Sequence, residues 1–321
     1  MSDMKLLHFW LTEGATNFTN FGGGLNNIFS DALIKHSFEH EFLMHELLSF
    51  SALHLSRLKP QDAQDYLYIS DAHHSKGLTL FQLAVSRLDD SNREPCYLFS
   101  SLIFIHAWAA QDVDKPSNLF FIPSQHSGDS EEVLKWVQLH RGSKAILTSN
   151  FSQIRNGGLR PMFEQWEDLG REKEDQLEEE DERSFDSFHE ALTSSLIPET
   201  QKAVLIEALN QLRRIFCFMS SHHYISKLSA VMSWFMTISD EYLLMLENKM
   251  PEALVIVAFY AVAIKRLPYM WWLEGKSENV LQTVLDELGG SWESHTRWAV
   301  EQIRGYTDAV IREELPRWSR K

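Results

Sequence analysis

The fold is decided by the stretch HEFLMHELLSFSALHLSRL, residues 40–58, in which apolar side chains recur at steps of three and four. Such spacing places Leu43, Leu47 and Phe50 on one face of an α-helix, the face that packs against the rest of a protein. Pro60 follows, and the helix is expected to end there because proline disfavours helical geometry in the residue before it. The segment therefore predicts a long amphipathic helix.

The helical pattern continues along the chain. Two segments are apolar on every side and predict buried central helices: CYLFSSLIFIHAWAA at residues 96–110 and LVIVAFYAVAI at residues 254–264. The second is far shorter than the roughly 20 residues of a membrane-spanning helix, so no membrane span is expected. Further helices are predicted at residues 62–88, 131–148, 199–219, 224–246, 277–288 and 292–315.

Turn residues are scarce, and this argues against a many-stranded sandwich or barrel. The chain has only 14 glycines and 9 prolines in 321 residues, and no long segment alternates apolar and polar residues as a half-buried strand does. We therefore expect an all-α fold, a single compact domain over residues 1–321 with about ten helices and an apolar central pocket.

Charge and cysteine content narrow the function classes. The formal net charge of −15 argues against direct binding of nucleic acid. Cys96 and Cys217 are too few for a disulfide framework or a thiolate zinc cluster, which favours a reducing compartment. The N-terminus, MSDMKLLHFWLTEG, lacks the apolar run of a signal peptide. We expect a cytoplasmic and/or nuclear location.

Much of the negative charge lies in one tract. Residues 164–182 contain eleven acidic and two basic side chains, and like charges at helical spacing repel one another. We expect residues 164–187 to form an acidic, mobile insertion that is solvated. The alternative is a docking site for a basic partner.

The histidines do not predict a metal site by their spacing. His36, His40 and His45 follow one another at intervals of four and five, and the string His40-Glu41-Phe42-Leu43-Met44-His45 is similar to a zincin pattern. The zincin geometry needs two histidines four apart, whereas five residues turn the second imidazole away from the first. The chain also lacks a Gly-x-Ser-x-Gly nucleophile elbow. We expect no metal and no cofactor.

Aromatic residues are the stronger lead, since they make up 12% of the chain. Large aromatic side chains usually fill a core, but several together can line a cavity in which indole N–H or phenol O–H groups orient a ligand. His106, within an otherwise apolar helix, is the candidate catalytic residue, with a buried and hydrogen-bonded structural histidine as the alternative. The candidate ligand-binding residues are Phe104, Trp108, Trp234, Met236, Phe259, Tyr260, Trp271 and Trp272.

Several strings, in order along nearly the whole chain, resemble one family. They are LLHFW (6–10), HEFLMHELLSFSALHLSRLKP (40–60) with Tyr66 and Ala72-His73-His74, WVQLHRGSKAIL (136–147), and PEALVIVAFYAVAIKRL (251–267) followed by WWLEG (271–275). Together they resemble the effector domain of fungal zinc-cluster transcription factors, and most of all the sterol uptake control regulators.

The resemblance implies an all-α effector domain with a deep hydrophobic pocket that binds an ergosterol-like lipid and thereby controls nuclear activity. The six-cysteine DNA-binding cluster of that family would lie upstream, and the two cysteines of this chain cannot form it. The chain is therefore expected to bind no nucleic acid directly.

Three functions stay open from the sequence. The first is a stand-alone binding module that buries a sterol- or terpenoid-like hydrophobic molecule. The second is a cofactor-independent cyclase or Diels-Alderase of fungal terpenoid or secondary metabolism, in which the pocket folds a substrate and His106, a Tyr or a Trp polarises a carbonyl. The third is an interaction domain without a small ligand that forms a homodimer or docks on a partner through its helices.

Overall fold

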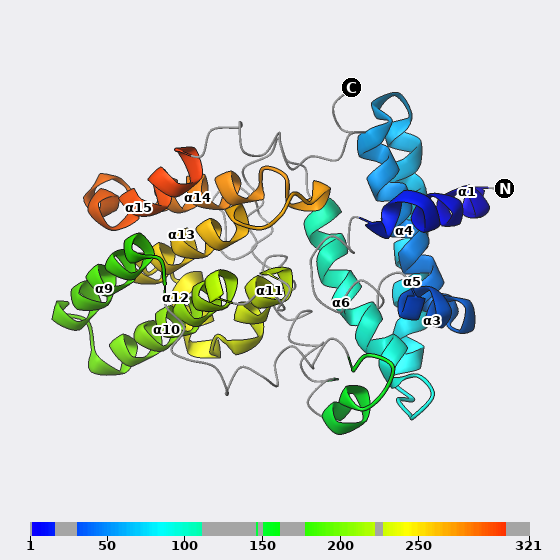
Figure 1. Ribbon diagram of the computed structural model, residues 1–321, viewed down its shortest axis with the longest axis horizontal. Helices are drawn as coiled ribbons and strands as arrows, with labels where there is room; N and C mark the ends of the chain where they lie inside the picture. Colours follow the sequence, from blue (N-terminus) through cyan, green and yellow to red (C-terminus); the bar gives the residue numbers. More distant parts are fainter. Residues whose placement is uncertain are drawn as a thin grey trace. The chain divides into compact units, whose positions relative to one another are not determined.

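In the part of the chain that the computed structural model describes, all regular secondary structure is helical (Figure 1). Contacts between Cα atoms divide the chain into two compact units: unit 1 comprises residues 1–111 and 138–171, and unit 2 comprises residues 112–137 and 172–321. The structure describes residues 2–16, 31–110, 146, 150–160, 177–221 and 227–305, without the side chains of residues 2, 221, 235 and 236.

Unit 1 is organised around α4 (Glu41–Leu58), which confirms the helix predicted from residues 40–58. α4 contacts α1, α3, α5 and α6, and most extensively α5. Pro60 ends the helix as expected and opens the short 3-10 turn that leads into α5. The remaining elements are α1 (Ser2–Phe9), a π-helical turn (Trp10–Gly14), α3 (Leu33–Glu39), the 3-10 turn Pro60–Asp62, α5 (Ala63–Val85) and α6 (Arg93–Ala110).

Unit 2 is organised around α13 (Pro251–Lys265), whose residues from Ala253 to Ile264 are all buried. Its apolar sequence has no polar face because α10, α11, α12, α14 and α15 all contact it. Pro251 occupies the first turn, where its missing N–H leaves no bond unmade. The other elements are α9 (Glu179–Ser194), α10 (Glu199–Ser221), α11 (Lys227–Thr237), α12 (Asp240–Glu247), a 3-10 turn (Trp271–Leu273), α14 (Lys276–Leu288), a 3-10 turn (Gly290–Trp292) and α15 (Glu293–Arg304).

The predicted all-α class is confirmed, since the described residues contain no strand. The single helix predicted over residues 224–246 is wrong: α11 and α12 are separate helices there. The chain breaks at Ser239, whose hydroxyl oxygen accepts a hydrogen bond from the N–H of Tyr242 at 3.2 Å and caps α12. α14 ends at Gly289 (φ 65°), as its sequence indicated. The helix expected at residues 131–148 and the end of that at 292–315 lie outside the described residues.

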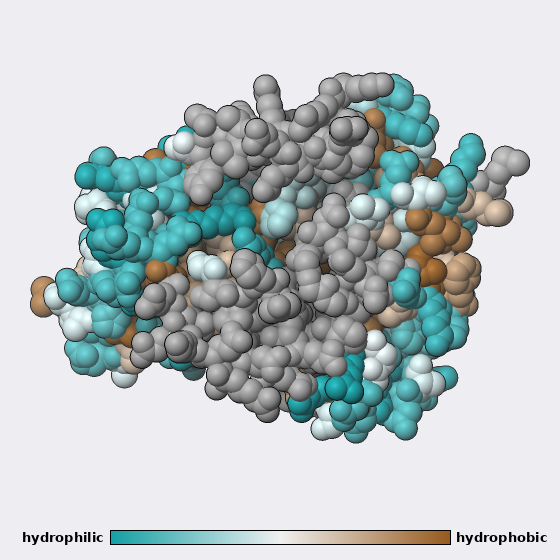
Figure 2. Space-filling view, in the orientation of Figure 1, coloured by the Kyte–Doolittle hydropathy of each residue, from teal (hydrophilic) through white to brown (hydrophobic). Residues whose placement is uncertain are grey.

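The acidic tract leads into α9. Residues 164–176 lie outside the described part of the chain, so the mobile insertion at 164–187 stays a prediction. The following residues begin α9, which buries Phe185, Phe188 and Leu192 on one face. Figure 2 shows that the visible surface over α9, α10 and α15 is mostly hydrophilic, as amphipathic helices around a buried α13 require.

Candidate functional site

A buried network of polar side chains joins α4, α5 and α6 in unit 1 and contains His106. Glu46 and Ser49 lie one helical turn apart on α4, and Ser70 and His74 lie one turn apart on α5, so each pair shares a helix face. Glu46, Ser49 and Ser70 have no solvent-exposed area, and His106 is 4% exposed. The network therefore lies between helices.

The hydrogen bonds divide into two connected groups. Ser49 Oγ donates to the Ser70 carbonyl oxygen at 2.8 Å and lies 3.0 Å from both Ser70 Oγ and His106 Nε2. His74 Nδ1 lies 2.8 Å from Glu46 Oε2. The two groups meet where the His74 and His106 rings stack, with centroids 3.9 Å apart and planes 2° from parallel.

Burial and charge shift the pKa values of the two stacked imidazoles in opposite directions. Burial by itself lowers the pKa of His74, but its hydrogen bond to Glu46 and the negative charges of Glu46 and Asp71 outweigh that effect, and the pKa is raised. Burial lowers the pKa of His106 to about 4. At neutral pH His106 is therefore uncharged, beside a histidine whose protonated form is favoured by a carboxylate.

The polar contacts between α4 and α5 extend toward α1. His45 Nδ1 and His73 Nδ1 are 2.7 Å apart, so one of them donates a proton to the other. Their outer nitrogens face carboxylates: His45 Nε2 lies 3.5 Å from Glu41, and His73 Nε2 lies 3.7 Å from Asp3. The α4–α5 interface is thus rich in histidine along much of its length.

The network uses the Ser49 hydroxyl and the His106 imidazole to join helices, whereas a catalytic site would have to expose such groups to substrate. A serine–histidine pair acts as nucleophile and base only where substrate reaches the serine oxygen. Ser49 is fully buried, and its oxygen is already engaged by Ser70 and His106. The sequence placed His106 correctly as a polar residue inside an apolar helix, and its catalytic role stays a prediction.

The candidate ligand-binding residues fall in both units. Phe104 and Trp108, on α6 of unit 1, are buried with ring centroids 5.6 Å apart. In unit 2, Trp234 stacks on Tyr260 with centroids 4.7 Å apart. The side chain of Met236 lies outside the described residues.

Phe259, although adjacent to Tyr260, belongs to a different aromatic cluster. Its ring centroid lies 4.6 Å from that of Trp298 and 5.3 Å from that of Phe185, because neighbouring residues of α13 point to different sides of the helix. Trp271 is 3% exposed, and Trp272 is fully buried, with no hydrogen-bond partner for its Nε1 among the described residues.

Among the residues that the structure describes, two groups of side chains bring metal-ligating atoms within 4.8 Å of one another: Glu46, His74 and His106, and the residues His36, Glu39 and His40. The second group was missed by the sequence analysis, which tested the spacing from His40 to His45. The available signal was the preceding interval, since residues 36–40 read His-Ser-Phe-Glu-His and the His-x-x-Glu-His pattern occurs in zinc enzymes.

Comparison with known proteins places the chain. The family model described as "Fungal specific transcription factor domain" matches residues 5–188, more than half of the sequence. The chain belongs to that family. The match begins within α1 and ends within α9, so the buried network lies inside this fungal transcription factor domain region.

Three curated relatives extend the comparison. A Zn(2)-C6 fungal-type transcription factor of Gibberella zeae is 21% identical over 312 residues, which cover 94% of this chain and 61% of that protein. Sterol uptake control protein 2 of Candida albicans is 32% identical over 149 residues, 46% of this chain and 19% of the relative. The protein of the same name in Saccharomyces cerevisiae is 35% identical over 103 residues, 32% and 11%. The chain thus spans about three fifths of the first relative and less of the others.

None of the described helices of this fungal transcription factor-type chain is both long and apolar enough to cross a membrane. An open hollow of about 250 Å³ lies on unit 2 and contains none of the sequence-predicted ligand-binding residues, so the central pocket stays a prediction. The hollow is lined by Ala203, Val204, Glu207, Ala208, Gln211, Ser239 and Glu241.

Proposed function

We propose that this chain is a ligand-responsive regulatory domain that buries a sterol- or terpenoid-like hydrophobic molecule among the aromatic residues of unit 2. The observation that carries the proposal is Trp272, a fully buried indole whose N–H has no acceptor among the described residues. A buried donor without a partner costs about 1–3 kcal/mol, which a ligand oxygen at that position would recover.

The chemistry of such a ligand fits the side chains nearby in the sequence. Met270 and Trp271, which precede Trp272, are almost fully buried and offer apolar surface. A sterol is a rigid apolar body with one hydroxyl group, so it needs a large apolar contact and a single polar contact. Trp272 Nε1 can donate to the hydroxyl oxygen and fix the orientation of the ring system.

The family and the names of the relatives support a regulatory use of the ligand. Two relatives are named sterol uptake control proteins, and a third is named a transcription factor. A domain of this family that senses a lipid would act in the nucleus or in the cytoplasm, through a partner or a DNA-binding segment. Recognition of the lipid is then the step that the residues of this chain perform.

Binding of a fluorescent sterol, dehydroergosterol, to the full chain tests the proposal. Energy transfer from tryptophan to the sterol should saturate at one sterol per chain. A sterol concentration of 100 times the Kd should raise the free energy of unfolding by about 2.7 kcal/mol. Trp272→Phe keeps an aromatic ring but removes the N–H, so the affinity should fall by about 3- to 10-fold, the equivalent of one neutral hydrogen bond.

Trp298→Phe is the matched control. Trp298 is also buried, and its Nε1 also lacks a partner in the described part of the chain, but its ring packs in the Phe185–Phe259 cluster. Its substitution should leave sterol affinity unchanged. Absence of saturable binding by the unsubstituted chain, for dehydroergosterol and for a terpenoid of similar size, would overturn the proposal. Extraction of the bound molecule should return it unaltered, whereas a cyclised product would favour the enzyme hypothesis.

A further inference from the structure

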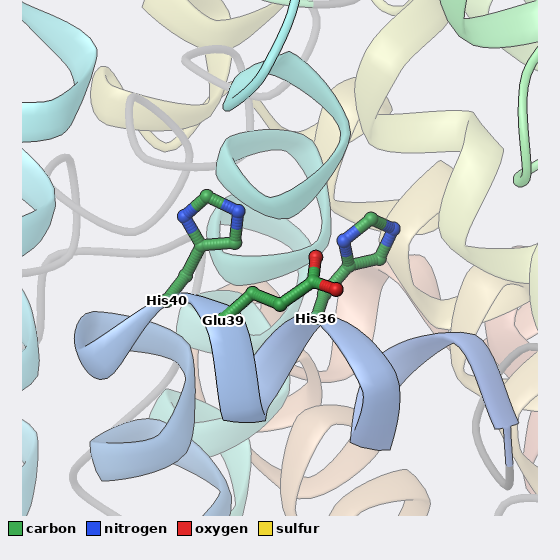
Figure 3. A group of neighbouring side chains, drawn as sticks. All are labelled: His36, Glu39 and His40. Carbon is green, nitrogen blue, oxygen red and sulfur yellow. The ribbon is translucent and has the colours of Figure 1, made fainter.

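We propose that His36, Glu39 and His40 form a binding site for a borderline divalent cation of the Zn²⁺ type at the junction of α3 and α4. His36 and Glu39 at the end of α3 and His40, which follows the helix, project to the same side in Figure 3, and the Glu39 carboxylate lies between the two imidazole rings there. Their ligand atoms all lie within 4.8 Å of one another. This site is independent of the proposed sterol binding.

The local backbone explains why the two histidines face each other. His40 has left the helix, with φ −128° and ψ 105°, but its N–H still donates to the His36 carbonyl oxygen at 2.8 Å. This bond closes the last turn of α3 and stacks residues four apart on one side. The ring centroids of His36 and His40 are 6.2 Å apart.

One ring nitrogen of His36 is oriented as a metal ligand in advance. His36 Nε2 lies 3.3 Å from Glu94 Oε2 of α6, and backbone N–H groups of Gly158 and Leu159 also hydrogen-bond this carboxylate. A proton on Nε2 for that contact leaves the lone pair on Nδ1, and Nδ1 is buried without a partner among the described residues. A carboxylate that holds the second nitrogen of a ligating histidine is a recurrent feature of zinc sites.

The donor set decides the class of cation. Two imidazoles and one carboxylate suit Zn²⁺ and its neighbours in the first transition row, whereas Mg²⁺ and Ca²⁺ prefer oxygen ligands alone. Zinc–ligand bonds of about 2.0–2.2 Å hold the ligand atoms close together, and the exposed Glu39 side chain can adjust to that spacing. Three protein ligands leave the fourth tetrahedral position open to water or to a second ligand.

The other cluster, Glu46, His74 and His106, is less suited to a cation. Its two imidazoles stack within 2° of parallel, so their in-plane lone pairs do not converge on one point. His106 Nε2 is also engaged by Ser49 and Ser70. Only the His36 cluster combines converging side chains with a ring nitrogen that lacks a partner in the described structure.

Isothermal titration calorimetry of the full chain with Zn²⁺ tests the site. We expect one Zn²⁺ per chain at this site, and an intense visible absorption when Co²⁺ replaces Zn²⁺ in tetrahedral geometry. Glu39→Gln and His40→Ala each remove a ligand and should weaken Zn²⁺ affinity at least about 10-fold, as loss of even a supporting residue weakens metal sites by 10- to 100-fold. Glu94→Gln should also weaken Zn²⁺ affinity at least about 10-fold, although it leaves all three ligands in place.

His8→Ala is the control, because His8 is an exposed histidine on α1 outside the cluster, and its substitution should leave Zn²⁺ affinity unchanged. Glu39 is exposed, so Glu39→Gln should unfold at the temperature of the unsubstituted chain when metal is absent, which separates loss of binding from loss of folding. The proposal would be overturned if the unsubstituted chain failed to bind Zn²⁺. It would also be overturned if Glu39→Gln and His40→Ala bound Zn²⁺ as tightly as the unsubstituted chain does.

Discussion

Asp181 of α9 and Arg266 at the end of α13 form a two-bond ion pair in which the carboxylate is completely buried. Arg266 Nη1 lies 2.5 Å from Asp181 Oδ2 and Nη2 lies 2.7 Å from Oδ1, while Nη2 also donates to Gln302 of α15. The guanidinium lies over the Phe216 ring of α10, 5.2 Å from its centroid. One arginine therefore links four helices of unit 2.

Asp181→Asn should destabilise the protein by about 3 kcal/mol, because removal of one partner from a buried pair leaves the other charge uncompensated. The free energy of unfolding in urea at neutral pH measures this loss. Glu180→Gln, at the exposed neighbouring position, is the control and should change stability by less than about 0.5 kcal/mol. Equal stability of the two variants would show that the ion pair does not support the fold.

The sequence could have distinguished Asp181 from the other acidic residues by helical phase. Asp181, Phe185, Phe188 and Leu192 are four, three and four residues apart, so Asp181 shares the apolar face of α9, and all four are buried. A count of charges treats the tract as uniform and predicts a solvated segment. The partner arginine lies 85 residues away and follows only from the tertiary fold.

Ser239→Ala should remove the cap that begins α12. Its hydroxyl oxygen accepts from the Tyr242 N–H, and loss of such a cap costs about 1 kcal/mol. Ser239→Asp keeps an acceptor at the same place and should retain most of the stability. Urea unfolding of both variants measures the difference, and equal losses in both would contradict a capping role.

Gly157→Ala should destabilise unit 1 by about 1–2 kcal/mol, since a methyl group at this position would overlap Glu94 Oε1. Glu94 cannot move aside without losing its bonds to the backbone of Gly158 and Leu159. Gly290→Ala is a suitable comparison because a methyl group there meets no atom within 4 Å. Thermal unfolding of the two variants checks the prediction, which fails if Gly157→Ala is as stable as Gly290→Ala.

The sequence predicted elements well and partners poorly. Helical period located α4 and α5, and unbroken apolar runs located α6 and α13, because both patterns are local properties of the sequence. His106 was recognised as unusual within an apolar helix, but its partners Ser49 and Ser70 lie 57 and 36 residues away. Contacts between helices depend on crossing geometry, which no spacing within one helix reveals.

The buried His106 makes stability depend on pH in a defined window. Its pKa is lowered from 6.5 in the unfolded chain to about 4 in the folded protein, chiefly by burial. A lowered folded-state pKa means that the unfolded chain binds a proton at a higher pH than the folded protein does. The contribution of His106 to stability is therefore fully present above pH 6.5 and is lost as the pH falls toward 4. His74, with its raised pKa, works in the opposite direction: its contribution is present below pH 6.5 and declines at higher pH.

His106→Gln isolates this effect, because the glutamine amide can still hydrogen-bond to Ser49 but does not titrate. Linkage gives about 2 kcal/mol for the loss of stability that His106 causes between pH 7 and pH 5, so the variant should lose that much less over the same interval than the unsubstituted chain. Urea unfolding at the two pH values measures both differences. His8→Gln, at an exposed position, should retain the pH dependence of the unsubstituted chain. An unchanged pH dependence in His106→Gln would mean that His106 is accessible to protons in the folded protein, contrary to its place in the buried network.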